Sequence, residues 1–143
     1  MSKSPPASSS NVRKVMQANT GVDSLIELRL RSLVHKSGLR YAIDSRPVTE
    51  INRRADIVFR SAKVAVFIHG CFWHGCRWHY KPPKSNRTFW INKVETNRKR
   101  DADTRRKLLK EGWAVLTYWE HQDPNAYIDD LVRTVRKRRR SLT

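Results

Sequence analysis

The feature that most constrains the fold is a cluster of two cysteines and three histidines within eleven residues, from His69 to His79. This stretch has the periodicity of neither a strand nor a helix, so its conformation needs another constraint. Thiols and imidazoles at short separations are ligands that zinc prefers. The sequence therefore predicts a structural zinc ion with three ligands from this cluster, namely Cys71, Cys76 and His79.

A tetrahedral zinc site needs a fourth ligand from elsewhere in the chain. His121 follows an expected strand and is the natural supplier, and His35 is the other histidine without a role. A disulfide gains little, because the loop it would close is short and a reducing cytoplasm would oppose it. The competing interpretation makes both cysteines small buried hydrophobic residues. We expect one zinc ion per chain, bound by Cys71, Cys76, His79 and His121.

Hydrophobic periodicity predicts helices and strands along the rest of the chain. Apolar residues recur at helical spacing between Asp23 and Gly38, and two β-branched runs joined by a polar turn should pair as a hairpin. A long basic helix further on carries Asp101 on a face that it shares with apolar residues, where a lone carboxylate is costly unless paired. The expected elements are helices at 23–38, 88–110 and 123–135, and strands at 39–43, 56–59, 64–68 and 114–119.

Length and composition predict a single domain with irregular ends. Residues 1–11 are rich in Ser and Pro and should form a flexible arm. Residues 12–135 should form the domain. Residues 136–143 should form a basic tail in which the run Arg136–Arg140 stays solvated.

The charge balance indicates a polyanionic partner. Thirty Lys and Arg residues against thirteen Asp and Glu residues give a net charge of +17, which favours binding to nucleic acid. No apolar stretch approaches the roughly 20 residues that a membrane span requires, and residues 1–11 contain no apolar run for a signal peptide. We expect a cytoplasmic monomer that binds double-stranded DNA and no membrane.

A second metal site is expected where the hairpin strands end. Asp56 opens one strand and His69 follows the next, which places a carboxylate and an imidazole at neighbouring strand ends. Mg²⁺ prefers oxygen ligands, and Asp56 with the backbone carbonyl of Ile68 would supply them. Considered alone, Asp56 is equally consistent with a turn residue or a cap.

A set of segments that spans most of the chain forms a recognisable pattern. The segments are Ala55-Asp-Ile-Val-Phe59, Val66-Phe-Ile-His-Gly-Cys-Phe-Trp-His-Gly-Cys76, Pro82-Pro-Lys-Ser-Asn86, Phe89-Trp-Ile-Asn-Lys93, Asn97-Arg-Lys-Arg-Asp101, Gly112-Trp-Ala-Val-Leu116 and Trp119-Glu-His121. Together they resemble the very short patch repair endonucleases, bacterial enzymes that nick DNA beside a thymine mispaired with guanine. The loop before Asp56 departs from that pattern, which commonly has Pro-Gly-Arg-Pro where this chain has Asn52-Arg-Arg-Ala55.

The resemblance implies an α/β fold of the type II restriction endonuclease-like class, related to the PD-(D/E)xK nucleases. This fold has a central mixed sheet flanked by helices, and in this family histidine chemistry replaces the usual lysine of the active site. Asp56 and the Ile68 carbonyl would bind Mg²⁺, and Glu27 would support the waters of the metal. The histidines matching His69 and His74 would act near the scissile phosphate. The aspartate matching Asp101 would orient His74.

Three aromatic residues near the catalytic histidines are candidates for sensing the mispair, namely Phe72, Trp73 and Trp90. A mispair is weakly stacked, so an apolar wedge opens the neighbouring step more easily there than in matched DNA. The alternative role for these rings is core packing. The basic residues expected to hold the DNA backbone are Lys81, Lys84, Arg87 and Lys93.

The sequence thus predicts a Mg²⁺-dependent endonuclease that nicks one strand beside a T:G mispair in very short patch repair. Such an enzyme would work at the nucleoid of a bacterium with other mismatch-repair proteins. One alternative is a defence or restriction-type nicking nuclease without a mismatch requirement. Another is a non-catalytic zinc-containing DNA-binding protein, for which the basic charge alone would suffice.

Overall fold

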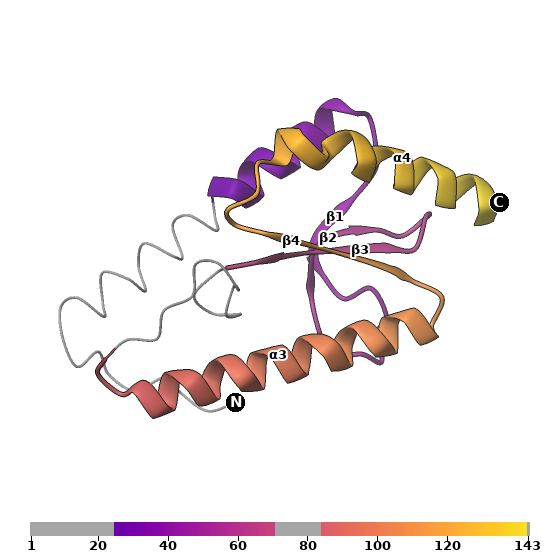
Figure 1. Ribbon diagram of the computed structural model, residues 1–143. Coiled ribbons are helices and arrows are strands. Elements are labelled where there is room, and N and C mark those ends of the chain that lie inside the picture. The colour runs from indigo at the N-terminus through magenta and orange to yellow at the C-terminus, as the bar shows by residue number, and fades with distance from the viewer. Residues whose placement is uncertain (1–24, 71–83, 143) are drawn as a thin grey trace.

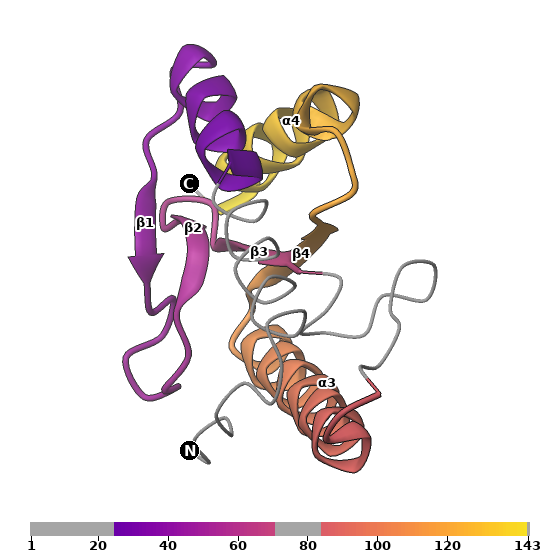
Figure 2. The ribbon, with the colours of Figure 1, turned by 90° about the vertical axis from the view of Figure 1, so that its left-hand side faces the viewer.

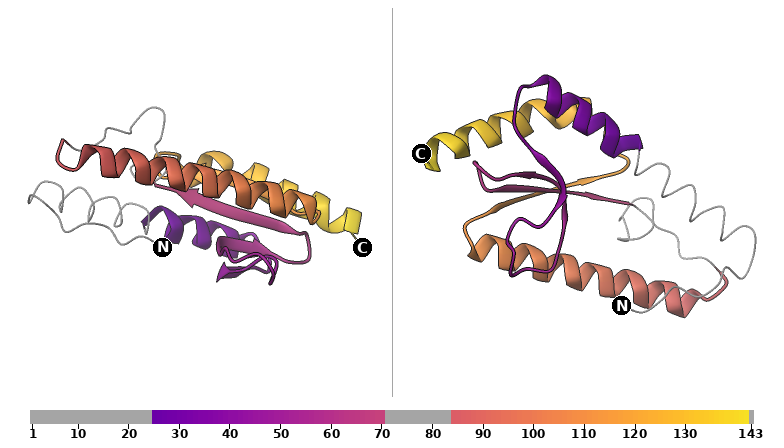
Figure 3. Two further views of the ribbon diagram at one scale, coloured as in Figure 1. Left: turned by 90° about the horizontal axis from the view of Figure 1, so that it is seen from below. Right: turned by 180° about the vertical axis from the view of Figure 1, so that it is seen from behind.

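The computed structural model describes residues 25–70 and 84–142, which form a sheet with helices on both faces (Figure 1). A helix over residues 25–36 and the C-terminal helix α4 cover one face, and helix α3 crosses the other. The same arrangement is visible from behind and from the side (Figures 2 and 3). In chain order, the labelled elements are β1 (Ala42–Ser45), β2 (Ala55–Phe59), β3 (Val64–His69), α3 (Arg87–Lys110), β4 (Ala114–Trp119) and α4 (Pro124–Leu142).

The sheet has four strands in the order β1-β2-β3-β4. Strand β2 pairs antiparallel with both β1 and β3, which confirms the predicted hairpin. Strands β3 and β4 run parallel, with Ile68 opposite Tyr118 and His69 opposite Trp119. Parallel neighbours need a long crossover, which here includes α3. The expected mixed sheet flanked by helices is confirmed.

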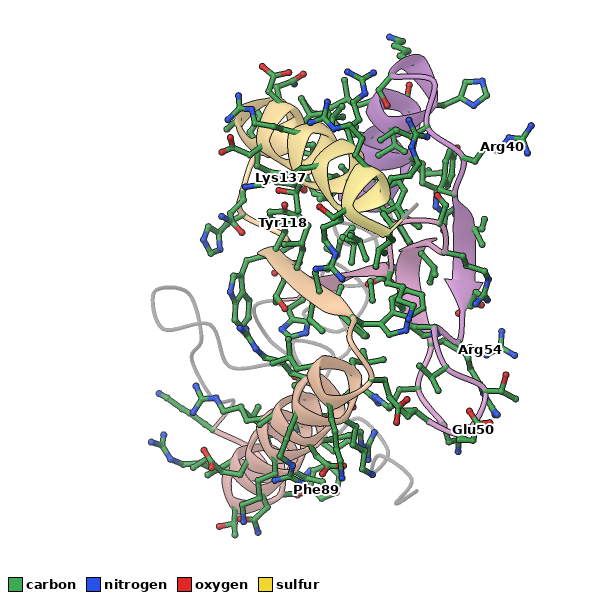
Figure 4. All side chains as sticks on the ribbon, turned by 90° about the vertical axis from the view of Figure 1, so that its right-hand side faces the viewer. Arg40, Glu50, Arg54, Phe89, Tyr118 and Lys137 are labelled. Atoms are coloured by element: carbon green, nitrogen blue, oxygen red, sulfur yellow. The ribbon has the colours of Figure 1, made fainter. Side chains whose placement is uncertain are left out.

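The side chains of β3 alternate between two hydrophobic clusters, as the period of a strand requires. Val64 and Val66 pack toward α4 and the helix over residues 25–36, whereas Ala65 and Phe67 pack toward α3. Tyr118 lies on the side of β4 that faces α4 (Figure 4), where its ring stacks on that of Tyr127 with centroids 3.7 Å apart. Burial of both faces explains why β2 and β3 are almost wholly apolar.

Most of the predicted boundaries agree with the structure to within one to three residues. Gly38 and Gly112 both have positive φ, 82° and 84°, and each follows the end of a helix as predicted. Strand β1 begins at Ala42 rather than at residue 39, because Leu39 first enters the core and is only 7% exposed. Within the described ranges, no helix combines the length and the apolar character that a membrane span requires.

Helix α4 continues through the basic run that was expected to be a solvated tail. It ends at Leu142, and Arg138 in its last turns is half-buried. The Arg138 guanidinium donates from Nε to the carbonyl of Ala62 at 3.0 Å and from Nη2 to that of Gly112 at 2.8 Å. These carbonyls belong to two turns far away in the sequence, so the arginine fastens the end of α4 to the domain. The expectation of solvation is therefore wrong for Arg138.

Replacing Arg138 with alanine should lower the free energy of unfolding by about 1–2 kcal/mol, because two turn carbonyls lose a charged donor. The matched control is Arg139→Ala, which removes an exposed arginine one position along the same helix. Thermal melting of both variants measures the difference. Equal melting temperatures for the two variants would show that Arg138 does not anchor α4.

Candidate active site

The first part of the site is a carboxylate fixed at the open end of the β2–β3 hairpin. Asp56 lies near the start of β2 and Ile68 near the end of β3, so the antiparallel pairing brings them together. The backbone N–H of Ile68 donates to Oδ2 of Asp56 at 2.6 Å. This bond holds the carboxylate beside Ile68, the residue whose carbonyl was predicted to share a metal ion with it.

A second carboxylate reaches the same place from the helix over residues 25–36. The pKa of Asp56 is raised to about 6, chiefly because the group is buried; the hydrogen bond from Ile68 opposes this shift, and the neighbouring carboxylate of Glu27 adds to it. Glu27 itself forms an ion pair with Arg31 at 2.9 Å. Two carboxyl groups from two elements therefore face each other at the end of the sheet. Their mutual repulsion is what a bound cation would relieve.

The third part of the site surrounds the last residue of β3. Nε2 of His69 lies 3.8 Å from Oδ2 of Asp101, which projects from the middle of α3. The His69 ring also meets that of Trp119 edge to face, with centroids 5.2 Å apart. The other oxygen of Asp101, Oδ1, lies 3.2 Å from Nη2 of Arg53. Since Ile68 and His69 are consecutive, Asp56 and this imidazole are both anchored at the same end of β3.

A pocket of about 140 Å³ opens between β3, β4 and α3 next to His69. Arg53, His69 and Asp101 all line it. Its other lining residues are Phe67, Ala102, Thr104, Arg105, Val115 and Thr117. The imidazole is therefore accessible from one side, although its side chain is only 12% exposed.

The structure thus brings together five residues singled out from the sequence, namely Glu27, Asp56, Ile68, His69 and Asp101. Asp101 was expected to orient His74, which lies outside the described residues; within them, Asp101 lies close to His69. Arg53 was not singled out, because the sequence marked its loop only as a departure from the family. No spacing rule links an arginine to a carboxylate 48 positions away.

The expected DNA-contacting residues on α3 and just before it differ in how far they are exposed. Lys84 and Arg87 are exposed near the start of the helix and Lys93 is half-buried. Trp90 is only 2% exposed, and its ring meets that of Phe89 edge to face. The burial of Trp90 favours the alternative role of core packing, since a ring inside the protein reaches a base only if it moves.

The remaining predicted site residues lie outside the described part of the chain: Cys71, Phe72, Trp73, His74, Cys76, His79 and Lys81. His121, the expected fourth zinc ligand, is exposed in the turn after β4. Among residues 25–70 and 84–142, no three His, Cys, Asp or Glu side chains are grouped as metal ligands. Both metal ions accordingly stay predictions.

Comparison with known proteins identifies the family of the chain. The sequence model of the family described as DNA mismatch endonuclease Vsr matches residues 7–80. The type II nicking enzyme V.NaeI of Lentzea aerocolonigenes is 39% identical over 122 residues, which cover 84% of this chain and 74% of the relative. The DNA mismatch endonuclease Vsr of Escherichia coli (strain K12) is 34% identical over 108 residues, 75% of this chain and 67% of the relative.

A carboxylate pair and an imidazole at the end of a mixed sheet, together with these relatives, define the chain as an endonuclease that acts on DNA. The chain belongs to the Vsr family of DNA mismatch endonucleases. The interpretation as a non-catalytic DNA-binding protein is therefore set aside.

Proposed function

We propose that this endonuclease depends on Mg²⁺ and nicks one strand of duplex DNA beside a T:G mispair in very short patch repair. In this proposal the sheet is the core of a type II restriction endonuclease-like fold, and one zinc ion stiffens the segment that follows β3. The observation that carries the proposal is that two pairs of side chains, Asp56 with Glu27 and His69 with Asp101, are placed at the same end of β3. Binding to DNA alone needs no such group of acids and imidazole.

The residues present fit a hard divalent cation. Asp56 has a pKa raised to about 6 because it is buried and faces Glu27, so its charged form is disfavoured unless a cation arrives. Asp56 and the Ile68 carbonyl would hold Mg²⁺, with Glu27 supporting its waters. When bound, Mg²⁺ supplies Lewis-acid stabilisation of the negative charge on the phosphate and lowers the pKa of a bound water.

The protein's own residues would position the DNA and move protons. His69 lies between Trp119 and Asp101, which suits an imidazole that exchanges a proton near the scissile phosphate. His74 would be the second such group. The cations Lys81, Lys84, Arg87 and Lys93 would hold the backbone. Of the proposed wedge residues, Phe72 and Trp73 remain candidates for entering the base stack.

The mismatch requirement separates this proposal from a restriction-type nicking nuclease. One relative is named a DNA mismatch endonuclease and another a type II nicking enzyme. We compare two duplexes that differ only in whether one position holds a T:G or a T:A pair. Nicking of the T:G duplex should be at least about tenfold faster, because opening the weakly stacked mispair costs less free energy. Trp73→Ala should reduce this ratio, with Trp113→Phe, a conservative change in the core, as the control. Equal rates on both duplexes with the unaltered protein would favour the restriction-type nuclease.

The zinc proposal rests on the chemistry of the donor set Cys71, Cys76, His79 and His121. Elemental analysis should find one zinc ion per chain, and Cys71→Ser should lower both the zinc content and the melting temperature. His121→Ala should also lose zinc, whereas the control His35→Ala should retain it. If the unaltered protein contains no zinc and Cys71→Ser has the same melting temperature as the unaltered protein, the zinc proposal is wrong.

A further inference from the structure

We infer that Arg53 is a positioning residue of the nicking site: it holds Asp101 so that one oxygen of this carboxylate faces His69. The inference rests on the proposed function, since it requires that His69 takes part in nicking. Three segments meet here that are far apart in the sequence, namely the loop before β2, the end of β3 and the middle of α3.

The two oxygens of Asp101 have different neighbours. Oδ1 accepts a hydrogen bond from Nη2 of Arg53 at 3.2 Å, and Oδ2 lies 3.8 Å from Nε2 of His69. The three side chains are between 12% and 30% exposed, so solvent does not screen them as it screens a surface pair. A carboxylate held at one oxygen by a guanidinium is restricted in rotation, which fixes the direction of its other oxygen.

Arg53 occupies this position at an electrostatic cost. Burial lowers the pKa of the Arg53 guanidinium, and the carboxylate of Asp101 opposes this effect. Nε of Arg53 is buried without a hydrogen-bond partner in the described part of the chain. An arginine that contacted only DNA would not need to lose water in this way before DNA binds. The desolvated guanidinium therefore points to an inward role toward Asp101.

The neighbouring arginine shows the contrast. The Arg54 side chain is 63% exposed and pairs with Asp44 at 3.5 Å, and it points away from the domain (Figure 4). The two neighbouring arginines of this loop thus have different directions, with Arg53 turned inward to Asp101 and Arg54 outward to Asp44.

The test is a double-mutant cycle on nicking of a T:G duplex in Mg²⁺, with kcat and KM measured separately. Arg53→Met should lower kcat about 10- to 100-fold and leave KM within about threefold, because the substrate still binds but Asp101 no longer holds His69. Arg53→Lys should recover only part of the loss, since lysine keeps the charge without the guanidinium fork. Arg53→Met combined with Asp101→Asn should be no slower than the slower single variant.

The matched control is a second arginine–aspartate pair, on α4. Arg133 and Asp130 lie 3.1 Å apart, with side chains 74% and 76% exposed, and Arg133→Met should change kcat less than twofold. Additive losses in the Arg53 cycle, or a higher KM with unchanged kcat and a smaller salt dependence, would show that Arg53 contacts DNA and would overturn the inference. If Arg53→Met does not fold, the same cycle with Arg53→Lys decides between these outcomes.

The result for His69→Ala separates this inference from the proposed function. If His69→Ala nicks at the wild-type rate, the proposed function fails and the inference fails with it. If His69→Ala is inactive while Arg53→Met has an unchanged kcat, only the inference fails.

Discussion

Replacing Asp56 with asparagine should reduce nicking at least about a thousandfold while DNA affinity changes no more than a few fold. The substitution removes an anionic ligand of the proposed Mg²⁺ and with it several kcal/mol of charge stabilisation in the transition state. It removes no cation that would contact phosphate. The amide oxygen can still accept the hydrogen bond from Ile68, so the local structure should persist. Nicking rates and binding to the same duplex measure the two effects.

The same variant should be more stable than the wild-type protein at pH 8 when metal ions are removed. The folded-state pKa of Asp56, about 6, lies above its ordinary value of 3.8. The folded protein therefore binds the proton more tightly, and stability falls as the pH rises from about 4 to about 6. Above that range the charged Asp56 costs up to about 2–3 kcal/mol, which asparagine avoids. At pH 4 the advantage of the variant should largely disappear.

Melting curves at pH 4 and pH 8, with EDTA and with Mg²⁺, test the stability effect. Mg²⁺ should raise the melting temperature of the wild-type protein and leave that of Asp56→Asn almost unchanged. The control, Asp129→Asn, alters an exposed residue of α4 and should behave like wild type in both assays. Nicking by Asp56→Asn at the wild-type rate would exclude Asp56 as a metal ligand.

Replacing His69 with alanine should slow nicking by at least about a hundredfold, which is the usual loss when an acid–base group is removed. His69 is the last residue of β3, held by Trp119 and Asp101. The KM for DNA should change little, because other residues supply the backbone contacts. Single-turnover nicking at saturating enzyme measures the chemical step directly.

His35→Ala is the control for this experiment. His35 is exposed on the helix over residues 25–36, which covers the face of the sheet away from α3 (Figure 1). This variant should nick at the wild-type rate. A similar loss of rate in both histidine variants, or a loss in His69→Ala explained by a lower melting temperature alone, would contradict a catalytic role.

The fold followed closely from the sequence because its elements are marked locally. The β-branched runs in β2 and β3 and the helical spacing of the apolar residues in α4 each identify an element without reference to the rest of the chain. The same reasoning ended α4 too early. Helix α4 continues to Leu142, and Arg138 near its end donates to the carbonyls of Ala62 and Gly112. Such partners are set by the folded topology.

The candidate site was predictable only where the sequence carries a motif. Asp56, Ile68 and His69 stand at the ends of paired strands and could be placed from the hairpin alone. Glu27 and Asp101 required the family resemblance, because a charge on a helix is most often solvated. Arg53 carried no local signal, since its partner lies on α3.

Trp90 illustrates the opposite difficulty. Its position at the start of α3 near the catalytic cluster favoured a DNA contact, yet the ring is buried. Whether an aromatic residue faces a base or a core depends on which elements pack over it, and spacing along one helix does not contain that information.

The most direct test of the account is strand-resolved cleavage of one end-labelled duplex that contains a single T:G pair, with the purified chain in Mg²⁺ or in EDTA. The account predicts one nick, in one strand beside the mispair, in Mg²⁺ and none in EDTA. Cleavage that persists in EDTA, or the absence of any nick in Mg²⁺ with a folded protein, would contradict it.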